Sequence, residues 1–584
     1  MSRIRSAAAL DRRSFLAVAG AAGAAAGLGF ALGAGGGEAT ATASARASAA
    51  STAPPAARRP GPQPALAPFS NGTTLRTVAT PRSGSGSGYR RLGEGPAWPR
   101  VVRDALAPAR SGRADRRRTL TAFVQLTDLH ITDVQHPMRY EFLRSGAPRS
   151  WRPHEALTVA GAVSLVERVN ALPAAPATGA PLSFVMTTGD NTDNNSRLEL
   201  DWFLTAMSGG RITPNSGDPH AYEGVQNSGL PLFWHPEEEL RDTEKRLGFP
   251  RVDGLLTAAL RQVNSPGLRL PWYSTIGNHD DLSGGVYSDT GGFFAEFAVG
   301  DRKLQTVPAS VAERVWRGSR KGQDPRGKGI RELLLAHRRE MRRVTPDERR
   351  APFTVEEYVR AHLDPAHAGR AGGPAGHGYT RANLDEGTLH YSFRISDDVL
   401  GISLDTTNRG GQYTGSIGTA QLRWLERTLE AHQDDHVIVF SHHYSASMTN
   451  PVEDPSRPGE TRHGGAELLA VLGRHRNVRA WANGHSHRNE ITPHGTFWEI
   501  TTASHVDHPQ LARVIELVDN EDGTLSLFTT LIEASAPYST DYTDLSQTGL
   551  ASLYRELSYN ARDTDRVLSG AARDRNTELL LKKG

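Results

Sequence analysis

Five short, β-prone runs in this sequence each lead into residues of the kind that bind metals. The runs occupy residues 119–126, 182–188, 272–276, 437–440 and 478–483. Their Val, Ile, Leu, Phe and Thr content predicts buried β-strands. The residues that follow them are Asp128-Leu-His130, Gly189-Asp190, Gly277-Asn278-His279-Asp280, Ser441-His442-His443 and Gly484-His485-Ser-His487. Because ligands of open α/β sheets bind at the carboxyl ends of strands, these five clusters are expected to meet.

The chemistry of each cluster suits a transition metal. Asp128 and His130 are two residues apart, and on an extended backbone such side chains point the same way. A carboxylate oxygen and an imidazole nitrogen suit Zn, Mn or Fe, although one Asp-x-His triplet by itself is usually an ordinary surface feature. Asp190 has two oxygens and can bridge a pair of ions about 3.5–4 Å apart. His485 and His487, again two residues apart, can each bind one ion of such a pair.

The tetrapeptide that ends in Asp280 adds a group for catalysis. Asn278 offers a neutral carbonyl oxygen to a metal, and the adjacent His279 points elsewhere, toward a bound substrate. Asp280 can accept a hydrogen bond from His279 and raise its basicity. In isolation, a strand-ending turn capped by Asn is the simpler interpretation, and the other clusters argue against it. The doublet His442-His443 leaves open which histidine faces the site.

Composition narrows the possible ligands and partners. The 584 residues include no cysteine, which excludes disulfides, thiolate metal sites and a cysteine nucleophile. A metal must therefore be held by His, Asp, Glu or Asn. The 67 basic residues nearly balance the 64 acidic ones, so we expect no specific nucleic-acid partner.

The N-terminal sequence predicts an export signal. Asp11-Arg-Arg-Ser-Phe-Leu16 resembles the bacterial twin-arginine motif, and an Ala- and Gly-rich apolar run follows it to residue 32. Residues 1–47 are therefore predicted to be a signal peptide read by the twin-arginine translocase, giving a secreted or cell-surface protein. An uncleaved anchor is the alternative, but the run is only modestly hydrophobic, so stable membrane insertion is not expected.

The remaining chain divides by composition. Residues 48–118 are rich in Pro, Ala, Gly and Ser and are predicted to be a disordered linker or to lie over the domain. The catalytic domain is predicted to span residues 119–535, with insertions at about 196–268 and 283–380. Residues 536–584 are predicted to be a C-terminal extension that packs back on the domain.

In order and type, the five clusters resemble the calcineurin-like metallophosphoesterase superfamily, in an exported bacterial branch with long insertions. The resemblance implies an α/β fold, a four-layer α/β/β/α sandwich, with two divalent or trivalent ions (Mn, Fe or Zn) at the strand ends. It assigns Asp128, His130, Asp190 and His487 to the first metal, and Asp190, Asn278, His442 and His485 to the second. It makes His279 a catalytic group that contacts the phosphate, oriented by Asp280, and it favours His442 over His443. Purple acid phosphatases have a metal-bound tyrosine where this chain has Asp193, so their chromophore is not expected.

The activity that this resemblance implies is hydrolysis of a small phosphate mono- or diester. A hydroxide that bridges the metals attacks phosphorus, and His279 protonates the departing oxygen. One alternative is a zinc amidase or lactonase, but those enzymes usually carry a His-x-His-x-Asp-His cluster that this chain lacks. The other is a non-catalytic metal-binding surface protein on the same fold, which would tolerate the loss of His279.

Overall fold

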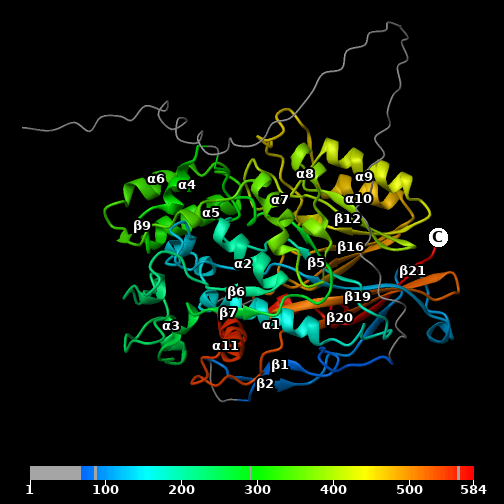
Figure 1. The fold of residues 1–584 in the computed structure, drawn as a ribbon, viewed down its shortest axis with the longest axis horizontal. Coiled ribbons are helices and arrows are strands. Elements are labelled where there is room, and N and C mark those ends of the chain that lie inside the picture. Colours follow the sequence, from blue (N-terminus) through cyan, green and yellow to red (C-terminus); the bar gives the residue numbers. More distant parts are fainter. Residues whose placement is uncertain (1–66, 84–87, 290, 372, 562–565) are drawn as a thin grey trace, which may run out of the picture. The chain divides into compact units, whose positions relative to one another are not determined.

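Two mixed β-sheets carry the predicted strands (Figure 1). The computed structural model describes residues 67–83, 88–289, 291–371, 373–561 and 566–584, which belong to one unit, Pro55–Gly584. The seven-stranded sheet has the order β3 (Val101–Arg103), β21 (Thr577–Lys582), β20 (Thr524–Glu533), β19 (Leu511–Asp519), β4 (Arg118–Leu126), β5 (Phe184–Thr188) and β8 (Trp272–Thr275). The six-stranded sheet has the order β11 (Tyr391–Ser396), β12 (Val399–Ser403), β14 (His436–Phe440), β16 (Val478–Asn483), β18 (Phe497–Thr501) and β17 (Glu490–His494). The prediction of a mixed α/β protein is confirmed.

The five predicted metal-site strands are parallel within each sheet. In the first sheet β4, β5 and β8 run parallel, and in the second β14 runs parallel to β16. Their carboxyl ends therefore lie on one edge of each sheet. The inner faces of the sheets pack together through Phe123, Phe184 and Phe440, with the rings of Phe123 and Phe440 5.5 Å apart. This packing brings the two edges to one place.

Helices cover the outer face of each sheet. One apolar cluster joins β4 and β5 to α1 (Thr158–Ala171) and α2 (Arg197–Ser208). Another joins β12, β14 and β16 to α9 (Thr419–Ala431) and α10 (Gly465–Arg474). Helix α2 falls within the first predicted insertion, yet Phe203 and its apolar neighbours belong to this core, because the helix buries its apolar face against α1.

The insertions supply short elements around this core. The first contains the pair β6 (Gly210–Ile212) and β7 (Val263–Ser265), together with α3 (Leu255–Ala259). The second contains α4 (Phe293–Val299), β9 (Arg302–Lys303), α5 (Ala309–Arg320), α6 (Lys328–Ala336), β10 (Arg342–Arg343) and α7 (Val355–Leu363). Helices α4, α5 and α6 lie together, around a separate apolar cluster (Figure 1). Helix α8 (Arg381–Glu386) and the pair β13 (Ile417–Gly418) and β15 (Arg462–His463) complete this part of the chain.

The described segments on both sides of the predicted catalytic domain pack on its core. Within the predicted linker, β1 (Val78–Pro81) pairs with β2 (Leu92–Gly95), and β3 pairs with β21, so the described residues before β4 are ordered and not a disordered linker. The C-terminal segment is part of the core, because Leu579, Leu580 and Leu581 of β21 are fully buried, and α11 (Gln547–Asn560) packs on α1. The predicted signal at residues 1–47 lies outside the described residues. No helix in the described residues is long and apolar enough to cross a membrane.

Candidate metal centre

All seven predicted ligands converge between the two sheet edges. In the described residues, every group of three or more acidic or His side chains with donor atoms within 4.8 Å of one another belongs to this single cluster. Its members include Asp128, His130 and His487 in one group and Asp128, Asp190 and His442 in another. Asp128 and His442 are fully buried. Buried carboxylates and imidazoles in such contact are stabilised when they bind a cation.

The backbone at the ligands is not extended, which corrects the geometric reason for the first pair. Five of the ten non-glycine residues with positive φ in the described chain are predicted ligands. They are Asp128 (φ 51°), His130 (φ 44°), Asp190 (φ 51°), His485 (φ 67°) and His487 (φ 56°). Each such conformation costs on the order of 1–3 kcal/mol and persists where the surroundings enforce it, typically at functional sites. The left-handed backbone conformations after the strands therefore direct these five side chains toward the cluster.

Three histidine rings are held by one nitrogen and present the other to the cluster. Nδ1 of His130 lies 2.9 Å from Oδ1 of Asp193, and Nδ1 of His442 lies 2.9 Å from the carbonyl oxygen of Thr188. Nδ1 of His487 lies 2.6 Å from Oδ2 of Asp507. An oxygen acceptor at Nδ1 fixes the tautomer and leaves Nε2 as the ligand atom, which is the usual arrangement around a protein-bound metal.

Asp190 and Asn278 occupy the centre of the cluster. Oδ2 of Asp190 lies 3.5 Å from Nε2 of His130 and 3.2 Å from Nε2 of His442. Oδ2 of Asp190 thus faces His130, a predicted ligand of the first metal, and His442, a predicted ligand of the second. The amide nitrogen of Asn278 donates to the carbonyl of Gly285 at 2.9 Å, which turns Oδ1 toward Nε2 of His442 at 3.0 Å.

Glycines permit the close approach of these backbones. A Cβ on Gly277 would lie 2.2 Å from the backbone nitrogen of Asp190, and a Cβ on Gly484 would lie 2.4 Å from Oδ2 of Asp128. Neither contact is possible for a larger residue without displacement. The glycine before Asn278 and the glycine before His485 are therefore required by packing at the site.

The residues fit a pair of bound cations. Nε2 of His130 is buried and has no hydrogen-bond partner in the described residues, although a buried polar atom normally has one. Burial lowers the pKa of His130 and of His485, so both rings stay neutral and offer lone pairs. Burial also opposes protonation of His442, but Asp190 outweighs it and raises the pKa of His442 to about 9. A cation in this position would replace that proton as the partner of the carboxylate.

The structure places His279 at the cluster but corrects the predicted role of Asp280. Nδ1 of His279 lies 2.8 Å from the carbonyl oxygen of Asp193, so Asp193 fixes the ring. The carboxylate of Asp280 instead accepts from the backbone nitrogens of Gly277, Asn191 and Thr192 at 2.9, 3.2 and 2.8 Å. The short side chain of Asp280 folds back on its own turn. Its carboxylate thereby links the loop after β8 to the loop after β5, and both loops carry predicted ligands.

His443 faces away from the central carboxylates. Its Nδ1 lies 2.9 Å from Oγ1 of Thr406, and its Nε2 lies 3.0 Å from the carbonyl oxygen of Tyr413. Nε2 of His442 lies 3.2 Å from Nδ1 of His485 and is the nitrogen that meets Asp190. This geometry favours His442 as the ligand of the doublet.

Sequence reasoning gave Asp193 a supporting role but missed Asp507 and Arg139. Asp507 contacts both His487 and Arg152, the latter at 2.6 Å. Asp193 pairs with Arg139 at 2.6 Å, and Arg139 also pairs with the buried Glu141. Asp507 follows strand β18, so its place after an apolar run was the one signal available. No local pattern marks Arg139.

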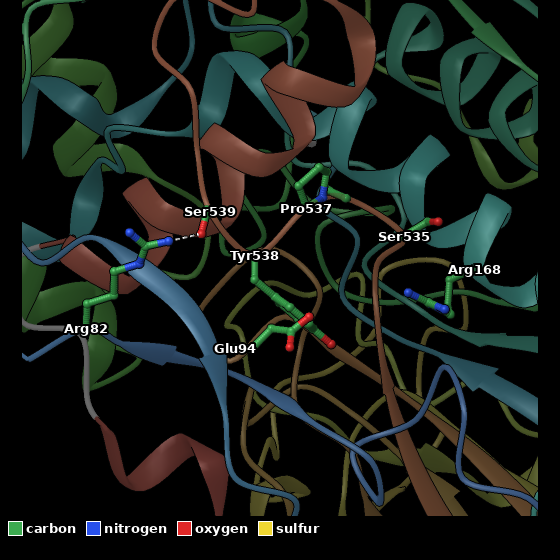
Figure 2. Close-up of a pocket in the computed structure, with 8 residues that line it drawn as sticks. Arg82, Glu94, Arg168, Ser535, Pro537, Tyr538 and Ser539 are labelled. Atoms are coloured by element: carbon green, nitrogen blue, oxygen red, sulfur yellow. Dashed lines mark hydrogen bonds between the residues drawn. The ribbon is translucent and has the colours of Figure 1, made fainter.

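Two cavities differ sharply in chemistry. One, of about 580 Å³, is lined by Arg82, Glu94, Arg168 and residues 535–539 (Figure 2). None of its eight lining residues is a histidine, and Glu94 is its single carboxylate. The other, of about 270 Å³, opens onto His130, Asp190, Asn278, His279, His485 and His487. The smaller cavity is therefore the candidate substrate site.

No protein-family model and no curated protein matches this sequence. Similar solved structures include a dimetal phosphatase from Danio rerio, with 11% identity, coverage of 72% of this chain and 100% of that chain, and a TM-score of 0.35. They also include a purple acid phosphatase from yellow lupin (10% identity, 78% and 54% coverage, TM-score 0.24). A third is a sulfate thiohydrolase from Thermus thermophilus (11% identity, 75% and 60% coverage, TM-score 0.25). Because these TM-scores are low, the similarity carries no functional argument. Any functional proposal must rest on the side chains of the cluster.

Proposed function

We propose that this protein is an exported phosphoesterase with a dinuclear metal centre, a member of the calcineurin-like metallophosphoesterase superfamily with that family's four-layer sandwich. Its substrate is a small phosphate mono- or diester. The twin-arginine translocase exports it to a secreted or cell-surface location. The main support is the arrangement of three histidines, each anchored at Nδ1, with their Nε2 atoms around Asp128 and Asp190.

The residues would divide the work as follows. Asp128, His130, Asp190 and His487 would hold one ion, and Asp190, Asn278, His442 and His485 the other. The ions would supply Lewis acidity, which lowers the pKa of water and neutralises charge on phosphoryl oxygens.

His279 acts on the leaving group. The carbonyl of Asp193 holds a proton on Nδ1, so Nε2 of the protonated ring is the donor toward the cavity. Transfer of that proton to the departing oxygen prevents an unstable alkoxide from forming. The backbone nitrogen of His279 donates to Oδ1 of Asp190 at 2.7 Å, which ties the donor to the centre of the cluster.

Turnover of bis(4-nitrophenyl) phosphate by Mn-loaded protein tests this proposal. With an alkyl phosphoester such as glycerol phosphate, whose departing oxygen needs a proton, His279→Gln should lower kcat by about 10²–10⁴-fold while bound Mn is retained. Asp190→Ala should remove both activity and bound metal. His220→Gln, at an exposed histidine, is the matched control. Unchanged turnover in His279→Gln and Asp190→Ala would refute the proposal, and two bound ions without turnover of any ester would support the non-catalytic alternative.

A further inference from the structure

The cavity at the metal cluster has a second wall that the phosphoryl chemistry does not need. Besides the ligand residues and charged groups such as Arg149 and Arg320, its lining includes the apolar and aromatic side chains Tyr140, Leu143, Val286, Tyr287, Trp316 and Tyr413. Trp316 belongs to α5 and Tyr287 to the loop before α4, so both come from the second insertion. Trp316 and Tyr140 are half-buried, so part of each ring remains accessible.

This aromatic wall is held in place by the chain that carries the metal ligands. A Cβ on Gly146 would lie 2.2 Å from the carbonyl oxygen of Ala309, so the start of α5 rests directly on the segment that follows His130. Oγ of Ser145 donates to the carbonyl of Val307 at 2.7 Å. The side of α5 that carries Trp316 is therefore preorganised, and a ligand need not order it.

Two ring contacts fix the orientation of aromatic side chains in this wall. Tyr140 and Tyr287 meet edge to face, with centroids 5.7 Å apart and planes at 62°. Tyr413 lies nearly parallel to the ring of His485, with centroids 6.1 Å apart and planes at 19°. Aromatic rings prefer such edge and offset contacts, so this wall can accept a further ring.

We propose that the second insertion forms an aromatic subsite, and that the substrate is a small phosphoester whose ester group carries an aromatic or heteroaromatic ring. This inference rests on the proposed function. The volume of about 270 Å³ lies just below the usual range of small-ligand sites, about 300–1,000 Å³, and favours one ring system beside the phosphoryl group over a polymer. Trp316 is the specificity-determining residue.

Calorimetric titration of the Mn-loaded protein with two phosphonates tests the subsite separately from catalysis. Phenylphosphonate and methylphosphonate present the same anion to the metal centre and differ in the ring. Wild-type protein should bind phenylphosphonate about tenfold more tightly. Trp316→Ala should abolish that preference while keeping the affinity for methylphosphonate, which also shows that the variant is folded. Trp316→Phe should retain most of the preference.

Trp424→Ala is the matched control, because Trp424 is also a half-buried helical tryptophan, on α9. It should keep the full preference. Equal binding of both phosphonates by the wild type, or an undiminished preference in Trp316→Ala, would overturn the aromatic subsite and leave the proposed function standing. Failure of the wild type to bind either phosphonate would overturn both proposals.

Discussion

Oδ2 of Asp507 lies 2.6 Å from Nδ1 of His487, while Nε2 of the same ring lies 3.3 Å from Oδ1 of Asp128. The two carboxylates thus hold one imidazole from both sides. Burial disfavours a charged ring here, but Asp128 and Asp507 outweigh it and raise the pKa of His487 to about 10. The orientation of His487 therefore depends on a residue outside the five sequence clusters.

Asp507→Ala should weaken metal binding by about 10–100-fold, because partners that orient a ligand histidine typically contribute this much. Calorimetric titration of chelator-treated protein with Mn²⁺ measures the effect. Asp253→Ala removes an exposed carboxylate paired with Arg251 and serves as the control. An affinity equal to that of the wild type would show that His487 needs no such support.

The two histidines after β14 should differ in their effect on metal content. His442→Ala should remove one of two bound ions, because it deletes the nitrogen that faces Asp190. His443→Ala should keep both ions and lower the free energy of unfolding by about 1–3 kcal/mol, since it leaves partners of a buried ring unsatisfied. Metal analysis together with urea unfolding separates the two outcomes, and the reverse pattern would move the ligand to His443.

Gly285→Ala should disturb His279 and the predicted metal ligand Asn278 together. Gly285 has φ 72°, and its Cβ would lie 2.4 Å from Nε2 of His279. We expect kcat to fall by about 10²-fold or more, the scale of a misplaced general acid, and the affinity for Mn to fall as well, because the added methyl would also lie 2.8 Å from Nδ2 of Asn278. Gly229→Ala is the control, because φ is 73° there and no atom lies within 4 Å of the added methyl. An equal loss of activity in both variants would show that backbone strain, and not the contact with His279, causes the effect.

Stability should fall in acid through buried histidines such as His362. Burial, with a smaller contribution from His377, lowers the pKa of His362 from 6.5 to about 3. Below pH 6.5, His362 is protonated in the unfolded chain but stays neutral in the folded chain. The free energy of unfolding therefore decreases as the pH falls from 6.5 toward 3. The decrease reaches about 1.4 kcal/mol per pH unit for one group.

His362→Phe should remove that part of the pH dependence, whereas His220→Phe at an exposed position should not. Urea unfolding at several pH values between 7.5 and 4.5 gives the comparison. Parallel curves for wild type and His362→Phe would contradict the assignment.

The apolar runs predicted β4, β5, β8, β14 and β16 because strand propensity and burial are local properties of the chain. The sequence did not reveal, for a different reason, that the C-terminal strand β21 joins the main sheet. Leu579, Leu580 and Leu581 are apolar, but only their pairing partner in β20 makes them a strand of the main sheet. The role of Asp280 could not be predicted from the sequence either. Its oxygens accept hydrogen bonds from Gly277 and Thr192 instead of His279, and these bonds form only when folding brings the two loops together.

The sequence by itself determined the types and order of the donor groups, because each stands directly after an apolar run and no cysteine competes with them. Tertiary structure alone decided which nitrogen of each ring faces the cluster. Asp193 reaches His130 across 63 residues of sequence, and Thr188 reaches His442 across 254. Such hydrogen bonds form between segments that only folding brings together, so no local pattern can encode them.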